Sequence, residues 1–326
     1  MVAFTPACRS SAAALACLVL CALPPALPAQ THRLVSVGDH RLDVVKAGSG
    51  GPALVFETGL ADSLDTWLPM LRTMSNSTTA IAYSRAGLGR SELGSSHNTA
   101  PEEAADLHAL LRGLGVLPPY ILVARSYGSI IARLYTSLYP GEVAGMVLVD
   151  GTHEQQVARW GAVDSTYPRA FRAYFDSVLA TLPPGPVANE TRETVRIQAA
   201  GTTPGLRPLP DIPIAVLTSM KSDESSPYVN GTARGHVVWR ALHEEWFHQS
   251  RNGIHIETTR SGHDIQADEP DLVQMAIRFV MDRVHLALPG RGCGHGARRR
   301  DARTTGGAVG RGGQHLPASL SRILRL

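Results

Sequence analysis

The sequence has few cysteines and little net charge. Three of its four cysteines, Cys8, Cys17 and Cys21, lie near the N-terminus, so Cys293 is the single thiol in the rest of the chain. One thiol cannot form an intrachain disulfide, and the folded part must therefore be stabilised by its core. The formal net charge of +3 comes largely from arginines after residue 290. The preceding residues are close to neutral or acidic, so we do not expect a dedicated nucleic-acid-binding surface there.

Two cofactor motifs each lack a required feature. Gly87-Leu88-Gly89 begins like a dinucleotide-binding fingerprint, but Glu92 occupies the place of its third glycine. The segment from His243 to His248 is one residue longer than H-E-x-x-H, and this extra residue rotates the second histidine off the helical face that the first one shares. We therefore expect neither a cofactor nor a catalytic metal.

The N-terminal apolar run is too short to span a bilayer as a stable helix. Arg9 is followed by this run over 11–23 and by small residues up to Ala29, a pattern typical of a secretory signal peptide. We expect residues 1–29 to be a signal peptide and the protein to be secreted or periplasmic. The mature chain then has no stable membrane span.

A lipid anchor on Cys17 or Cys21 is the competing interpretation. Leu20 is large for the residue before such a cysteine, and Cys17 falls early in the apolar run. Lipid anchoring is therefore the less favoured of the two.

Apolar strands and amphipathic helices alternate through the middle of the chain. Alternating segments on both sides of Gly38-Asp39-His40 predict a hairpin over 34–47. Beyond it, continuous apolar stretches predict buried strands, and the segments between them have helical spacing. The expected strands are 53–56, 79–83, 120–125, 145–150, 214–217 and 254–258. This alternation predicts an α/β fold with a mostly parallel sheet flanked by helices.

Residues from about 153 to 210 interrupt the alternation. They contain no clear strand and carry aromatic residues along helical segments. We expect a helical cap, inserted after the strand ending at Asp150, whose aromatic residues either line a pocket or pack the cap onto the body. One domain is expected over 30–288, followed by a Gly- and Arg-rich tail over 289–326 that is too poor in apolar residues to fold.

The most informative stretch surrounds Ser126. The apolar run from Tyr120 ends at Ala124-Arg125-Ser126-Tyr127-Gly128, after which helical spacing begins. A serine is a poor nucleophile unless a sharp turn between strand and helix exposes it beside a base and oxyanion donors. The stretch resembles the nucleophile elbow G-x-S-x-G of the α/β-hydrolase family, with Ala124 in place of the first glycine. The resemblance covers roughly 34–285 and implies that fold, with Ser126 as the nucleophile.

The same resemblance implies a histidine base and an acid that orients it. His263 lies between the last strand and the last helix, where the family has its base. Asp223 follows the strand before that, and its spacing to Pro227 resembles a common family pattern. Asp150 ends the strand after the elbow helix, from which some members supply the acid. We favour Asp223 and keep Asp150 as the alternative.

The oxyanion donors that the family architecture implies are the backbone N–H groups of Leu60 and Tyr127. Leu60 follows Thr58-Gly59, where relatives commonly have H-G, so Thr58 departs from the pattern. The stretch from Ser84 to Ser91 resembles D-x-P-G-x-G-x-S, with serine and alanine in the places of its Asp and Pro.

These residues predict an exported serine hydrolase that acts on a small-molecule carboxylic ester or related acyl substrate. A peptidase, lactonase or thioesterase would use the same machinery, and a protein of this fold that binds without turnover is the alternative from another class. Arg125 either binds an anionic substrate group or supports the elbow, and the supporting role is favoured. The motifs specify neither the identity of the substrate nor the oligomeric state.

Overall fold

The computed structural model describes residues 31–287. The expectations for residues 1–29 and 289–326 therefore lie outside the described residues. Within them, one eight-stranded sheet has the order β1-β2-β4-β3-β5-β6-β7-β8. The strands are β1 (Arg33–Ser36), β2 (Arg41–Ala47), β3 (Ala53–Glu57), β4 (Ala80–Tyr83), β5 (Tyr120–Arg125), β6 (Val143–Val149), β7 (Ile214–Ser219) and β8 (Gly253–Thr258).

The strand directions confirm the predicted α/β class. β2 pairs antiparallel with both β1 and β4, and all other neighbouring strands are parallel. The carboxyl ends of the parallel strands therefore lie along one edge of the sheet, where ligands bind in open α/β sheets. The expected hairpin over 34–47 corresponds to β1 and β2.

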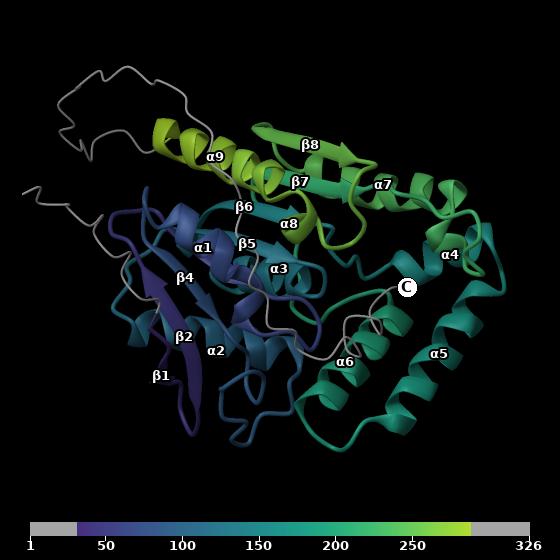
Figure 1. Ribbon diagram of the computed structural model, residues 1–326, viewed down its shortest axis with the longest axis horizontal. Coiled ribbons are helices and arrows are strands. Elements are labelled where there is room, and N and C mark those ends of the chain that lie inside the picture. Colours follow the sequence, from purple (N-terminus) through teal and green to yellow (C-terminus); the bar gives the residue numbers. More distant parts are fainter. Residues whose placement is uncertain (1–30, 288–326) are drawn as a thin grey trace, which may run out of the picture.

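Helices cover both faces of the sheet (Figure 1). The α-helices of the described part are α1 (Leu68–Met74), α2 (Ala100–Gly113), α3 (Gly128–Leu138), α4 (Gln156–Val163), α5 (Tyr167–Thr181), α6 (Pro186–Ala200), α7 (Ala233–Phe247), α8 (Ile265–Asp268) and α9 (Pro270–Ala287). Successive residues of β5 point to opposite faces. Ile121 and Val123 belong to the core under α1 and α9, whereas Leu122 and Ala124 belong to the core that includes α2, α3 and α7.

Helix α2 shows why the local sequence folds as it does. The Thr99 backbone N–H donates to Oε2 of Glu102 at 3.0 Å, and the two residues form a capping box. Pro101 stands in the first turn, where its missing N–H costs no helical hydrogen bond.

The predicted cap corresponds to α4, α5 and α6, which lie between β6 and β7 in the chain and to the right of the sheet in Figure 1. The backbone N–H of Ala100, at the start of α2, donates to Oε1 of Glu193 on α6 at 3.1 Å. Helix α6 is therefore joined to the body by specific polar contacts as well as by packing.

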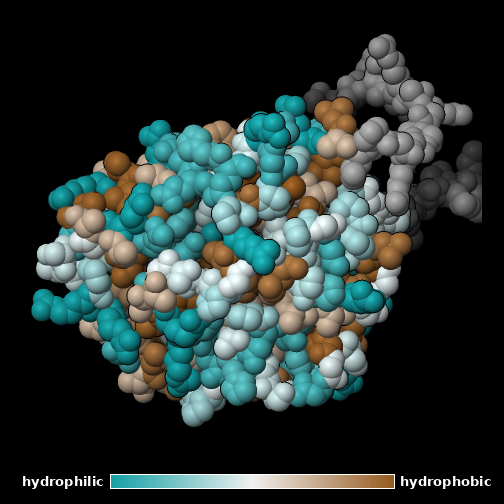
Figure 2. Space-filling model, turned by 180° about the vertical axis from the view of Figure 1, so that it is seen from behind, coloured by the Kyte–Doolittle hydropathy of each residue, from teal (hydrophilic) through white to brown (hydrophobic). Residues whose placement is uncertain are grey.

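Polar and apolar side chains are mixed over the face shown in Figure 2. The exposed large apolar residues come from separate elements, for example Leu34 of β1, Val237 of α7 and Met275 of α9. None of the helices between residues 31 and 287 is both long and apolar enough to cross a membrane.

Candidate active site

Ser126 occupies the turn between β5 and α3. Its φ of +51° lies in the left-handed region that residues with a Cβ rarely adopt. The turn is packed closely against the loop after β3, because a Cβ at Gly128 would lie only 2.4 Å from the Thr58 carbonyl oxygen. Ser126 is partly exposed and lines a cavity of about 760 Å³ at the carboxyl ends of the strands. The predicted arrangement of strand, sharp turn and helix is confirmed.

His263 lies in the loop between β8 and α8, and Nδ1 of its ring is 2.6 Å from Oδ2 of Asp150. A carboxylate can only accept, so the imidazole donates Nδ1–H and leaves Nε2 available as a base. Asp150 directly follows β6, and its Oδ1 accepts from Ser219 N at 2.9 Å and from Trp239 Nε1 at 2.8 Å. The carboxylate is thus fixed on both oxygens.

The pKa of Asp150 reflects two opposing effects. Burial raises it, but the hydrogen bond and the charge interaction with His263 outweigh burial, so the pKa is lowered from its ordinary value. Asp150 therefore remains ionised at neutral pH despite being 4% exposed.

Asp223 is not brought to His263. Its Oδ1 accepts hydrogen bonds from the backbone N–H and the hydroxyl of Ser225, at 2.9 and 2.6 Å, in an exposed local turn. The geometry corrects the preference for Asp223, because the carboxylate beside His263 is that of Asp150. Asp150 is held in place because the backbone N–H of Ser219, at the end of β7, donates to its carboxylate. The loop after β7 instead forms a local turn in which Asp223 contacts Ser225.

Ser126 and His263 line the same cavity. Among residues 31–287, no hydrogen bond joins their side chains directly. Catalytic hydrogen bonds are often long in the absence of substrate and tighten when it binds. Ser126 and His263 thus share one cavity and are the residue types that a nucleophile and its base require.

The loop after β3 is anchored on both sides of Leu60. Arg85 Nη2 donates to the Gly59 carbonyl at 2.6 Å, and the Ala61 N–H donates to Oε2 of Glu190 on α6 at 2.8 Å. Leu60, like Tyr127, lines the cavity. The loop expected to supply an oxyanion donor is therefore held in one conformation by the body and by the cap helix α6.

Arg85 is the centre of a fully buried ionic cluster. Its guanidinium contacts Glu57 and Glu190, each at 2.7 Å, and lies 3.5 Å from Glu103. Burial, together with the nearby charge of Glu190, raises the pKa of Glu103 well above its ordinary value, as expected where carboxyl groups outnumber the cation. The Tyr127 hydroxyl donates to Oε2 of Glu103 at 3.0 Å. The residue after Ser126 is thereby tied to the cluster that holds the loop after β3.

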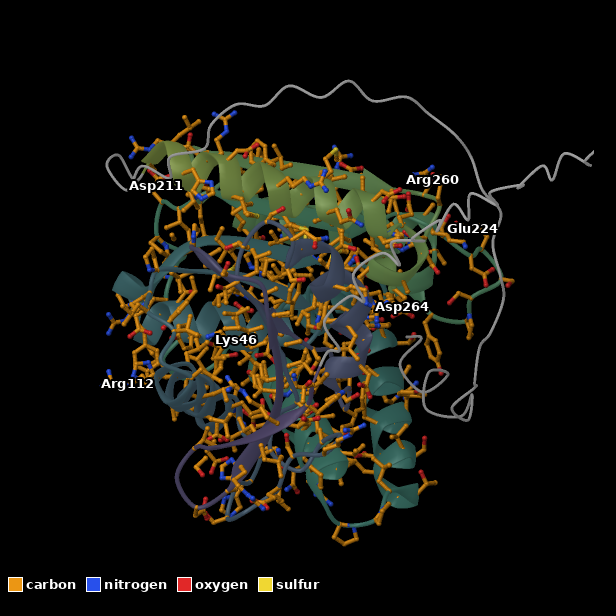
Figure 3. The ribbon with its side chains drawn as sticks, turned by 60° about the vertical axis from the view of Figure 1, so that its left-hand side comes forward. Lys46, Arg112, Asp211, Glu224, Arg260 and Asp264 are labelled. Atoms are coloured by element: carbon orange, nitrogen blue, oxygen red, sulfur yellow. The ribbon has the colours of Figure 1, made fainter. Side chains whose placement is uncertain are left out.

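Arg125 is buried beside Ser126 and contacts two loops of the site. Its guanidinium donates to Oδ1 of Asp264, the residue after His263, and its Nη1 lies 3.5 Å from Oδ2 of Asp62 in the loop after β3. Arg125 is 5% exposed. Asp264 lies on the same side of the molecule as Glu224 and Arg260, away from Lys46 and Arg112 (Figure 3). Arg125 thus connects the loops that carry the candidate base and the candidate oxyanion donor.

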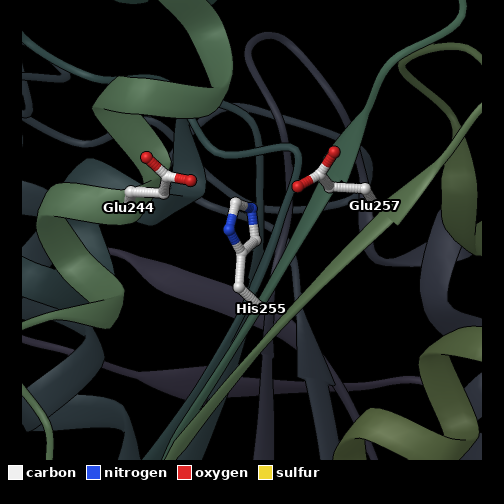
Figure 4. Close-up of side chains that lie close together, drawn as sticks. All are labelled: Glu244, His255 and Glu257. Carbon is white, nitrogen blue, oxygen red and sulfur yellow. The ribbon is translucent and has the colours of Figure 1, made fainter.

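One group outside the cavity has the composition of a metal site. Single ligand atoms of Glu244, His255 and Glu257 lie within 4.8 Å of one another, and both carboxylates face the imidazole (Figure 4). However, Arg240 Nε lies 3.1 Å from Glu244 and 3.0 Å from Glu257, and His255 Nε2 is hydrogen-bonded to Thr218. These carboxylates are already paired with a cation, so we interpret the group as an ion-pair cluster.

Several residues of the site were not identified from the sequence. Trp239 and Ser219 hold Asp150, and Arg85 and Glu190 hold the loop after β3. The sequence contained one signal for them, since Arg85 lies in the stretch that resembles D-x-P-G-x-G-x-S. Ser219, Trp239 and Glu190 lie in a strand and two helices with no motif around them, and their contacts are with residues far away in the sequence.

Comparison with known proteins agrees with the fold. A family model described as alpha/beta hydrolase fold matches residues 52–189. The chain is 26% identical over 237 residues to the protein YqjL of Bacillus subtilis. This alignment covers 72% of this chain and 85% of YqjL. It is 29% identical over 183 residues to a 2-(acetamidomethylene)succinate hydrolase of Mesorhizobium japonicum, covering 54% of this chain and 65% of the relative.

Among solved structures, an esterase from Thermogutta terrifontis has a similar fold. The TM-score is 0.56 at 18% sequence identity, and the match covers 78% of this chain and 99% of that one. At this identity the likeness concerns the fold alone. The residues matched by the family model include Ser126 and Asp150 but end before His263.

Proposed function

The chain belongs to the α/β-hydrolase fold family, and we propose that it is a serine hydrolase that cleaves carboxylic esters. In this proposal Ser126 is the nucleophile, His263 the base and Asp150 the acid. The main support is the 2.6 Å hydrogen bond between His263 and Asp150 at the cavity that Ser126 also lines.

The proposed reaction follows from the roles of these atoms. Ser126 Oγ attacks the ester carbonyl carbon while His263 Nε2 takes its proton, and the oxyanion accepts hydrogen bonds from the N–H groups of Leu60 and Tyr127. His263 then protonates the departing alcohol, which leaves an acyl-enzyme on Ser126. Water activated by His263 hydrolyses this intermediate and regenerates the free serine.

The choice of an ester over other acyl substrates is a proposal taken from one protein of similar fold and from the size of the cavity. The Thermogutta protein is an esterase, and a small ester fits a cavity of about 760 Å³. The Mesorhizobium relative acts on a succinate derivative. Of the described residues that line the cavity here, Lys221 is the only lysine or arginine, and it is exposed, so a doubly anionic substrate is less suited to this site.

A protein that binds esters without turnover is the second candidate. It is favoured by the absence, in the described part of the chain, of a direct hydrogen bond between Ser126 and His263. Labelling with a fluorophosphonate separates the two candidates, because only an activated serine reacts rapidly. We expect covalent labelling at Ser126, identified by peptide mass spectrometry. Label that persists in Ser126→Ala, or no label in the wild type, would refute the serine-hydrolase proposal.

Export is a separate proposal that rests on the sequence of residues 1–29. Expression of the full chain in a bacterium should give a product in the medium or periplasm whose N-terminus is Gln30. N-terminal sequencing checks this. A cell-associated product that retains the leader or carries lipid on Cys17 or Cys21 would contradict it.

A further inference from the structure

A continuous row of aromatic rings forms one wall of the cavity. Trp239 of α7 stacks on Trp160 of α4, with 5.2 Å between ring centroids and an interplanar angle of 23°. Trp160 meets Tyr167 of α5 edge to face at 5.4 Å. The row continues along α5, through Phe171 and then Phe175, whose centroids are 4.7 Å apart. All five residues line the cavity.

This aromatic wall begins beside the proposed triad. Trp239 donates its indole N–H to Oδ1 of Asp150 at 2.8 Å, and the wall then leads away into the cap. Each ring is mostly covered, with exposure between 4% and 8%, so the rings are held in place by their neighbours. A group attached to the reacting ester would therefore meet a fixed surface of ring edges and faces.

The composition of the lining indicates the shape of that group. Leu60 is the only leucine, isoleucine, valine or methionine among the described residues that line the cavity. Planar rings gain additional stabilisation from offset or edge-to-face contact with aromatic side chains, beyond the burial of their area. The wall is thus suited to a planar aromatic ring.

A buried histidine stands next to this wall. His236 lies one turn before Trp239 on α7, lines the cavity and is 8% exposed. Within residues 31–287, its Nδ1 has no hydrogen-bond partner. Thr194 of α6, which also lines the cavity and is 7% exposed, likewise has an unpartnered hydroxyl in this part of the chain. Buried polar atoms are usually hydrogen-bonded, so a polar substituent of a ligand is a suitable partner.

Burial lowers the pKa of His236, so the ring is neutral at pH 7 and can both donate and accept a hydrogen bond. A hydroxyl group has the same dual capacity. A carboxylate would lack a buried cation here, because the one lysine of the lining, Lys221, is exposed.

We propose that the esters cleaved at this site carry a neutral, planar aromatic ring seated on the aromatic wall, and that His236 recognises a hydroxyl substituent of that ring. This inference rests on the proposed function, of which it names the substrate class. Phe171 and Phe175 then select the ring, and His236 selects its substituent.

The experiment compares matched esters on the purified protein. The esters that vary the acyl group are methyl phenylacetate, methyl para-hydroxyphenylacetate and methyl cyclohexylacetate. The esters that vary the alcohol are benzyl acetate and cyclohexylmethyl acetate. Methyl hexanoate and ethyl acetate serve as references. We expect kcat/KM to be about tenfold higher for the aromatic member of at least one matched pair, and several-fold higher again with the hydroxyl. Higher rates for cyclohexyl or hexanoate esters would overturn the aromatic assignment.

Variants assign the preference to the named residues. Phe171→Leu and Phe175→Leu should reduce the preference for phenyl over cyclohexyl, while Phe279→Leu, a matched change on α9, should leave it unchanged. His236→Phe should remove the preference for the hydroxylated ester and keep the preference for the ring. An unchanged hydroxyl preference in His236→Phe would refute the role of His236.

Failure of the proposed function gives a different result. In that case no ester, ethyl acetate included, is turned over and fluorophosphonate does not label Ser126. Calorimetric titration with the unreactive amides N-methylphenylacetamide and N-methylcyclohexylacetamide then tests the aromatic wall directly. Tighter binding of the phenyl amide supports the inference, and equal or weaker binding refutes it.

Discussion

His263 and Asp150 are 113 residues apart in the chain, yet Nδ1 of the first lies 2.6 Å from Oδ2 of the second. Ser219 and Trp239 donate to the other carboxylate oxygen. Asp150 therefore cannot leave His263 without breaking hydrogen bonds to both β7 and α7. This fixed carboxylate is the basis of the first prediction.

Replacement of Asp150 by asparagine should lower kcat by about 10³- to 10⁴-fold with little change in KM. The reason is that the His263 ring is then no longer held in the tautomer with Nδ1–H, and the imidazolium formed during the reaction is no longer stabilised by a carboxylate. Asp223→Asn is the matched control and should retain most activity, since its carboxylate contacts Ser225 in an exposed turn. Steady-state kinetics on both variants, with folding checked by circular dichroism, measure the difference. The opposite ranking would return the acid to Asp223.

Arg125→Lys should lower kcat about 10- to 100-fold, because lysine cannot contact Asp264 and Asp62 together as the guanidinium does. KM for a neutral ester should change little. Arg172→Lys is the matched control, since Arg172 forms an exposed ion pair with Asp176. A large rise in KM confined to anionic esters would show instead that Arg125 binds substrate.

Gly128→Ala should destabilise the fold by about 1–3 kcal/mol, because the added Cβ would lie 2.4 Å from the backbone oxygen of Thr58 and 2.8 Å from Cγ of Glu57. Gly141→Ala is the control, as a Cβ there meets no atom of the described residues within 4 Å. Thermal unfolding of the two variants checks the prediction. A Gly128→Ala protein as stable as the control would show that the elbow can move away from the loop.

The free energy of unfolding should fall as the pH drops from 6.5 towards 4. Burial lowers the pKa of His243 from 6.5 to about 4, so the unfolded chain binds a proton in this range that the folded chain does not. Stability from this residue is complete above pH 6.5 and decreases below it, by about 3 kcal/mol in total. His243 Nε2 donates to the Gly151 carbonyl at 2.9 Å, and its Nδ1 accepts from Thr218.

Calorimetric melting of the wild type and of His243→Asn at several pH values tests this dependence. The variant should be less stable at neutral pH and should lose less stability on acidification. Equal pH dependence in the two proteins would contradict the prediction and assign the acid sensitivity to other buried histidines, such as His153, whose pKa burial lowers to about 3.

Much of the fold follows from patterns within short stretches of sequence. Continuous apolar runs predicted the parallel strands, and the region around 153–210 was correctly separated from the sheet. The turn at Ser126 was predicted because strand, small residues and helix follow one another directly. The short helix α8 and the turn that occupies Asp223 were not predicted, since four residues carry too little periodicity.

The sequence alone determined the order of strands and helices, the turn that presents Ser126 and the loop that carries His263, because each depends on residues adjacent in the chain. Three further features depend on tertiary packing: the carboxylate that contacts His263, the contacts by which Arg85 and Glu190 hold the loop after β3, and the set of aromatic rings that line the cavity. The Arg125–Asp264 contact, for instance, joins residues 139 positions apart. Such contacts depend on the packing of side chains from distant segments, and local periodicity contains no information about which distant side chains meet.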